Sequence, residues 1–272
     1  MLPVRRLIVV LSLISGLILA AGTAPAQEQA VVEIPSRGQT IRALLIKPAN
    51  PVASVVLLAG GHGVLALSGD GKIGWGAGNQ LVRTRAAYAQ AGFATIVPDA
   101  ASDMGTPAKP KNGYRSSAPH GQDVGAVIAY MRAIKAPVVL VGTSKGAVSA
   151  GAVLAQTAGA TRPDAVVLTA PMLMPVGKQP SFLQAMGNNP QKAQLPFLVV
   201  GHRKDGCQYT QPASIDQFKA WHRGKVDVVM LDGPEGKGDP CEARAAHGFA
   251  GIDGQVVQTV AGWIKGNILK GP

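Results

Sequence analysis

The sequence predicts an α/β fold, built on an eight-stranded, mostly parallel sheet with helices on both faces. Two patterns support this prediction. Short runs rich in valine, isoleucine and leucine recur along the chain with turn residues at their ends, and alanine-rich segments of helical length lie between several of them. This alternation is typical of a parallel sheet whose two faces are both covered by helices.

Eight runs are expected to be strands, and they span residues 31–34, 41–46, 54–59, 93–98, 138–141, 165–169, 197–201 and 226–231. The first two are joined by a short turn and are expected to pair antiparallel. Helices are expected at 79–91, 122–134, 145–157, 212–221 and 253–264. Asn79 and Asp253 are expected to be N-caps, because their side chains can accept hydrogen bonds from the first free backbone N–H groups.

Residues 1–26 have the features of a signal peptide. Arg5 and Arg6 precede an apolar run at 7–21, which is followed by the small-residue motif Ala24-Pro25-Ala26. The run is shorter than the ~20 apolar residues that cross a bilayer, so no membrane anchor is expected after cleavage. We therefore expect residues 27–272 to be exported, to the periplasm or outside the cell, and to fold as a single domain.

The chain contains two cysteines, Cys207 and Cys241. Because an exported chain meets an oxidising environment, these two are expected to form a disulfide. A metal site is the alternative. The pair lacks the C-x-x-C spacing typical of zinc sites, so no metal is expected.

The formal net charge is +11, but lysine and arginine are scattered along the chain and form no run longer than two residues. Nucleic-acid binding needs clustered positive charge, so no nucleic-acid partner is expected. Residues 69–74 match G-x-G-x-x-G, yet this segment starts ten residues past its strand and opens no helix, so no dinucleotide cofactor is expected. No pattern in the sequence predicts an oligomeric state.

The strongest chemical signal is Gly142-Thr143-Ser144-Lys145-Gly146. This G-x-S-x-G segment directly follows an expected buried strand and directly precedes an expected helix, the context of a nucleophile elbow. Small flanking residues allow the serine to adopt strained backbone angles and to present its hydroxyl above the edge of the sheet. We therefore expect Ser144 to be a nucleophile.

A serine hydroxyl is a weak nucleophile at neutral pH and needs a base together with a group that orients the base. With the chain order serine, acid, histidine, His247 is the expected base because it lies between the last strand and the last helix. His222 ends an expected helix and is expected at the surface. Asp205, after the strand at 197–201, is the expected acid, and Asp232 is its main rival.

A tetrahedral intermediate would need backbone donors for its oxyanion. One is expected to be the N–H of Lys145, and the second an N–H of Gly61 or His62 in the glycine-rich loop after the third strand. The long connections 60–78 and 171–195 are expected to form walls of a substrate pocket. The candidates in the second connection are Met172, Leu173, Met174 and Phe182, and the alternative is that these apolar side chains only seal the core.

With an oxyanion loop after the third strand, a nucleophile elbow after the fifth, an acid after the seventh and a histidine after the eighth, the sequence resembles the α/β-hydrolase superfamily over residues 27–272. It is most similar to small bacterial esterases and dienelactone-hydrolase-like proteins. The resemblance implies the α/β-hydrolase fold with little or no cap, the triad Ser144, Asp205 and His247, and hydrolysis of a small-molecule ester without a cofactor. A lysine after the nucleophile is a departure from the family pattern. An amidase or peptidase with the same triad, and a non-catalytic binding protein, are the alternatives.

Overall fold

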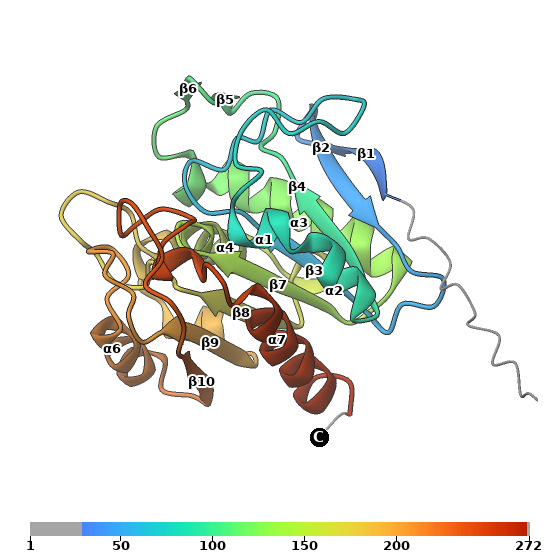
Figure 1. Ribbon diagram of the computed structural model, residues 1–272. Helices are drawn as coiled ribbons and strands as arrows, with labels where there is room; N and C mark the ends of the chain where they lie inside the picture. Colours follow the sequence, from blue (N-terminus) through green and yellow to red (C-terminus); the bar gives the residue numbers. More distant parts are fainter. Residues whose placement is uncertain (1–28, 271–272) are drawn as a thin grey trace, which may run out of the picture.

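Figure 1 shows the computed structural model of the chain, which describes residues 29–270. Eight strands form one sheet in the order β1-β2-β4-β3-β7-β8-β9-β10. Their bounds are β1 Gln29–Ser36, β2 Gln39–Ile46, β3 Ala53–Leu58, β4 Phe93–Pro98, β7 Val138–Thr143, β8 Ala165–Thr169, β9 Phe197–His202 and β10 Val226–Leu231. Strand β2 runs antiparallel to both of its neighbours, and every other pair in the sheet is parallel. The predicted fold class is confirmed, and the expected signal peptide lies outside the described residues.

Helices cover both faces of the sheet, because the central strands are buried along their whole length and need apolar partners on each side. Helices α3 (Ala118–Ile134), α4 (Gly146–Gln156) and α6 (Ala213–His222) contribute to the hydrophobic core on one face. Helices α1 (Gln80–Arg83), α2 (Arg85–Gln90) and α7 (Asp253–Asn267) contribute to the core on the other. Within residues 29–270, no helix is long and apolar enough to cross a membrane.

The connections contain only short elements. A two-stranded ribbon, β5 (Gly105–Thr106) and β6 (Lys109–Pro110), follows β4, and a four-residue helix, α5 (Phe182–Ala185), lies between β8 and β9. Single 3-10 turns are η1 (Tyr114–Ser116), η2 (Gly159–Thr161), η3 (Pro190–Ala193) and η4 (Ala246–Gly248). No inserted domain covers the carboxyl edge of the sheet in the described part of the chain, in agreement with the prediction of little or no cap.

Two local predictions are wrong. The helix expected at 79–91 is interrupted at Thr84, whose φ and ψ are −94° and 1° and whose hydroxyl donates to the Gln80 carbonyl. Asn79 occupies the predicted N-cap position of α1, although its side chain makes no capping bond. Asp253 is not an N-cap: Ile252 holds that position, and Asp253 is the first residue of α7, where its carboxylate binds Arg83 instead.

Candidate active site

Ser144 lies at the carboxyl end of β7, in the sharp turn that leads into α4. Its φ is +52°, in the left-handed region that a non-glycine residue occupies at a cost of about 1 kcal/mol or more. Three backbone hydrogen bonds hold it there. Its N–H donates to the Thr169 carbonyl at 3.0 Å, and its own carbonyl accepts from Ala147 N–H at 3.1 Å and Met172 N–H at 3.2 Å.

The two glycines of the motif are required by close backbone approach. A Cβ on Gly142 would lie 2.7 Å from the Gly146 carbonyl oxygen, across the turn. A Cβ on Gly146 would overlap the Leu58 carbonyl oxygen at the end of β3. Side chains at these positions would therefore push the serine turn away from the sheet or open the turn itself.

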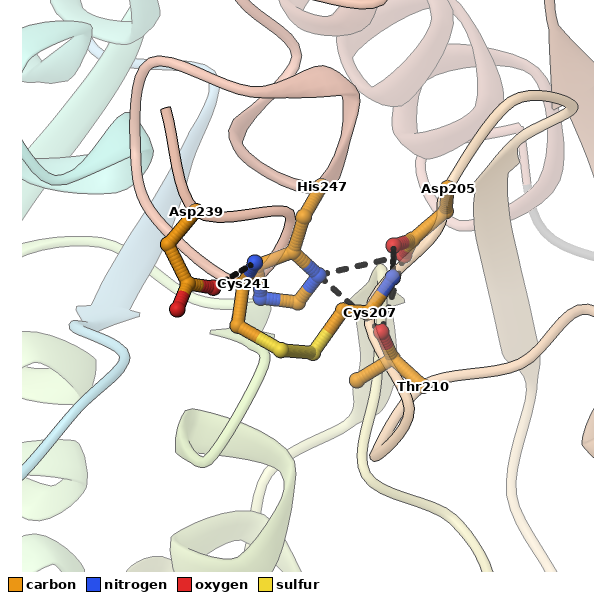
Figure 2. Close-up of a disulfide and its surroundings, with 6 residues drawn as sticks. All are labelled: Asp205, Cys207, Thr210, Asp239, Cys241 and His247. Atoms are coloured by element: carbon orange, nitrogen blue, oxygen red, sulfur yellow. Dashed lines mark hydrogen bonds and ion pairs between the residues drawn. A yellow bond between two sulfur atoms is a disulfide. The ribbon is translucent and has the colours of Figure 1, made fainter. Parts of the chain in front are cut away.

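His247 lies in η4, between β10 and α7, and is only 5% exposed. Its Nδ1 is 3.1 Å from Asp205 Oδ2 and 3.0 Å from Thr210 Oγ1 (Figure 2). Because the Thr210 hydroxyl donates its own hydrogen to Asp205 Oδ2 at 2.9 Å, it faces Nδ1 with a lone pair. Both neighbours thus favour a proton on Nδ1, which leaves Nε2 as the acceptor nitrogen of the neutral imidazole. Nothing in the sequence singles out Thr210, since a lone threonine in a loop belongs to no motif.

Asp205 follows β9 and is 8% exposed. Its second oxygen, Oδ1, accepts from the backbone N–H of Cys207 at 2.9 Å. The predicted disulfide is confirmed: Cys207 is bonded to Cys241, with an S–S distance of 2.08 Å (Figure 2). The rival acid, Asp232, has a largely exposed side chain that pairs with Arg203 Nε at 3.1 Å. Of the two candidates, Asp205 is the one that the structure brings to the histidine.

The loop that carries His247 is anchored by a side chain from the opposite wall of the site. Arg83, at the end of α1, donates to the Gly248 carbonyl at 2.6 Å, to the Gly78 carbonyl at 2.6 Å and to both carboxylate oxygens of Asp253 at 2.8 Å. One guanidinium therefore joins the glycine-rich connection, the histidine loop and the first turn of α7. A single arginine in a helical pattern gives no sequence signal of this role.

Ser144 and His247 line the same cavity, which has a volume of about 280 Å³. The other side chains around it are Trp75, Asn79, Gln80, Thr143, Cys241, Glu242 and Ala243, and glycines 60, 61, 76, 78 and 248 complete it. Gly61 lines this cavity, while His62 and Lys145 line a neighbouring one. Within residues 29–270, the backbone N–H groups of Gly61, His62 and Lys145 have no hydrogen-bond acceptor. Three unpaired donors thus lie beside the serine turn.

The His62 side chain is held by contacts within its own loop. Its Nδ1 accepts from the Val64 N–H at 3.1 Å, and its ring packs against that of Trp75 with 3.6 Å between centroids and an interplanar angle of 33°. Burial, and the nearby positive charges of Arg115 and Lys145, lower the pKa of His62. The ring is therefore neutral at neutral pH and fixes the loop.

The remaining histidines have structural partners. His222 is 1% exposed and its Nε2 lies 2.8 Å from the Ala193 carbonyl, so the expectation of a surface residue is wrong. His120 is buried against the Ser149 hydroxyl at 2.6 Å, and burial lowers the pKa of His120 to about 3. His202 is buried at the end of β9, where its Nδ1 accepts from the backbone.

The apolar residues expected to form a pocket wall in 171–195 instead fill the core. Leu173 and Phe182 are fully buried, and Phe182 packs edge-on against Phe197 and Phe218. Met172 packs against α4, and the half-buried Met174 packs against the main core. None of the four lines the cavity of Ser144 and His247, so that prediction is wrong. The other expected wall, 60–78, does line it, through residues that include Trp75 and the glycines.

No family model and no curated protein matches the sequence of this chain. Solved structures do match its fold. An α/β serine hydrolase homologue from Coxiella burnetii is 16% identical, with a TM-score of 0.58 over 85% of this chain and 95% of that one. The esterase domain of a Rhodothermus marinus protein is 14% identical, with a TM-score of 0.58 over 88% and 98% of the two chains. A dienelactone hydrolase from Anabaena variabilis is 15% identical, with a TM-score of 0.56 over 88% and 98%.

The strand order, the serine turn and these structural similarities together identify the fold. The chain has the α/β-hydrolase fold, as its sequence resemblance implied. Within residues 29–270, no group of three or more His, Cys, Asp or Glu side chains is placed to hold a metal ion.

Proposed function

We propose that this protein is an exported serine hydrolase that cleaves a carboxylic ester through an acyl-enzyme on Ser144. The observation that carries the proposal is the shared cavity: a strained serine at the end of β7 and a histidine whose Nδ1 is held by a buried aspartate line the same small space. Each part has a role that acyl transfer requires.

In the proposed reaction, the Ser144 oxygen bonds to the ester carbonyl carbon while His247 Nε2 takes the serine proton. The carbonyl oxygen becomes an oxyanion and accepts hydrogen bonds from the N–H of Lys145 and from an N–H of Gly61 or His62. When the bond to the alcohol oxygen breaks, His247 returns the proton to the leaving alcohol. Water then attacks the acyl-enzyme by the same route, releasing the acid and restoring the serine.

Asp205 and Thr210 support this reaction by what they do at Nδ1. The carboxylate accepts from Nδ1–H and stabilises the imidazolium that forms when Nε2 is protonated. The Thr210 hydroxyl, which donates to the same carboxylate oxygen, holds that oxygen in place. The base is therefore oriented by two side chains from the loop after β9.

Export is the second part of the proposal. It is supported by the signal-peptide features of residues 1–26 and by the disulfide, a bond that persists in oxidising compartments.

The test is covalent labelling with a fluorophosphonate, followed by ester hydrolysis. We expect wild-type protein and the exposed control Ser102→Ala to be labelled. Ser144→Ala, confirmed as folded by circular dichroism, should not be labelled and should lose at least ~10³-fold in rate. An ester and an amide with the same acyl group separate esterase from amidase. Wild-type protein that is neither labelled nor active on either substrate would support a binding protein instead.

A further inference from the structure

Two cavities flank the serine turn, and they differ in charge. The wall of the cavity of Ser144 and His247 contains one acidic side chain, Glu242, and neither lysine nor arginine. The second cavity, of about 520 Å³, has no aspartate or glutamate in its wall. Its cationic side chains are Lys111, Arg115, Lys145 and Lys178, and its other lining residues include His62, Tyr114 and Gln179.

None of the four cations has an anionic partner in the described part of the chain. No ion pair involves any of them. Lys145 Nζ contacts only a neutral acceptor, the Gln179 side-chain carbonyl, at 3.1 Å. No neighbouring group that the structure describes compensates the positive charge of Lys145. Burial and the positive charge of Arg115 both disfavour its charged form and lower the pKa of Lys145.

Arg115 also lacks a negatively charged partner within residues 29–270, and it is the most deeply buried of the four cations. It is 6% exposed and its guanidinium donates to the Ala59 carbonyl at 2.5 Å, but its Nε is buried without any hydrogen-bond partner. Burying a guanidinium without a carboxylate is unfavourable, because the lost hydration is not replaced. A wall with four cations, one of them buried and incompletely paired, is complementary to an anion.

We propose that this second cavity, which we call the cationic pocket, binds an anionic group at the far end of the acyl half of the substrate. The inference rests on the proposed ester hydrolysis. His247 must return its proton to the alcohol oxygen, so the alcohol half lies on the His247 side, in the first cavity. The acyl half then extends past Lys145 and His62 into the cationic pocket.

The substrate class that follows is an ester whose acid carries a second, ionised group, such as a monoester of a dicarboxylic acid. Its hydrolysis consumes one water and yields the alcohol and a dicarboxylate. The lysine after the nucleophile, unusual for the family, then has a function: its N–H supports the oxyanion while its side chain binds the distal anion.

The experiment compares matched ester pairs at low ionic strength. Monoethyl glutarate is compared with ethyl pentanoate, in which a methyl group replaces the distal carboxylate, and the succinate and adipate pairs vary the length. We expect wild-type kcat/KM to favour the anionic ester by at least ~10-fold, the value of one charge-assisted hydrogen bond. Lys145→Met should remove most of this preference, Lys145→Arg should restore it, and the exposed control Lys219→Met should leave it unchanged.

A second measurement does not depend on turnover. Glutarate and inorganic phosphate are titrated into Ser144→Ala by calorimetry, with Lys178→Met added in the same background. We expect binding that weakens with the added substitution and with salt, and the tighter of the two anions identifies the group that the cationic pocket takes.

The outcomes separate the two proposals. Equal rates on both members of every pair, together with no anion binding, would overturn the cationic pocket while leaving ester hydrolysis intact. Absence of labelling and of hydrolysis on all esters would overturn the proposed function, and the substrate class with it.

Discussion

Removing the disulfide should impair catalysis before it unfolds the protein. The bridge joins the two loops that hold the proposed base, His247 (Figure 2). Cys207 N–H donates to Asp205 Oδ1, and Cys241 lies in the wall of the cavity that His247 also lines. In Cys207→Ser/Cys241→Ser, both loops keep their hydrogen bonds but lose the covalent link between them. We expect the imidazole to sample positions away from Ser144.

The magnitude has two parts. The bridge closes a loop with a sequence separation of 34 residues, so its loss should lower the free energy of unfolding by about 4 kcal/mol in the chain-entropy model. Misplacing a catalytic group by an ångström costs about 10²-fold in rate, and a loop that spends part of its time displaced should lose between about 10-fold and 10²-fold in kcat. The two effects are measured separately.

The assay is kcat together with far-UV circular dichroism, at a temperature well below the melting point of the double variant. Wild-type protein treated with a reductant is the second sample, because it breaks the same bond without changing a residue. A variant that is fully folded and fully active would refute the coupling and leave the bridge as a structural link only. Mass spectrometry that finds two free thiols in the purified, non-reduced protein would refute the bridge itself.

Four further predictions concern single residues. Asp205→Asn should lower kcat by about 10² to 10⁴-fold, because an amide can select the wrong imidazole tautomer, whereas Asp232→Asn should change it little; the reverse ranking would move the acid to the loop after β10. Thr210→Val should lower kcat by about 10-fold with KM unchanged, and Thr210→Ser should recover the rate; equal rates in both would exclude a role for the hydroxyl. Gly146→Ala should destabilise the fold by about 1–3 kcal/mol in urea unfolding, because its Cβ overlaps a strand carbonyl. Burial and nearby arginines lower the pKa of His120 to about 3, so as the pH falls the unfolded chain binds this proton first. The contribution of His120 to the free energy of unfolding should therefore fall by up to ~1.4 kcal/mol per pH unit between about pH 6.5 and pH 3, and His120→Asn should show a smaller slope.

The strands could be predicted because burial on both faces makes their sequence signal local. The run 138–141 in β7 is aliphatic throughout, and the glycines of the serine motif come directly after it. The serine turn also has a local signal, because the close contacts of Gly142 and Gly146 restrict those positions to the smallest residue. Local rules failed where a partner is distant in sequence: Asp253 has the chemistry of an N-cap, but Arg83, from the other wall, binds its carboxylate.

Two parts of the site region have no local signal: the connection 171–195 and the cationic pocket. An apolar connection can line a cavity or seal a core, and the composition of 171–195 is the same in either case. The packing of Phe182 onto Phe197 and Phe218, which are distant in sequence, shows that this connection belongs to the core. The cationic pocket is equally hidden, because Lys111, Arg115, Lys145 and Lys178 are single basic residues in three separate stretches of chain.

The Arg83 contacts described above imply that two properties of the site cannot be changed independently. The guanidinium bonds to the carbonyl of Gly78 in the glycine-rich connection and to the carbonyl of Gly248 beside His247, and both glycines line the first cavity. The width of this cavity and the position of the histidine loop are therefore coupled through one side chain. Widening the cavity to admit a larger alcohol, by enlarging or shifting 76–78, would pull on the carbonyl next to His247. A redesign for bulky alcohols would therefore have to provide the histidine loop with a new anchor before the wall is moved.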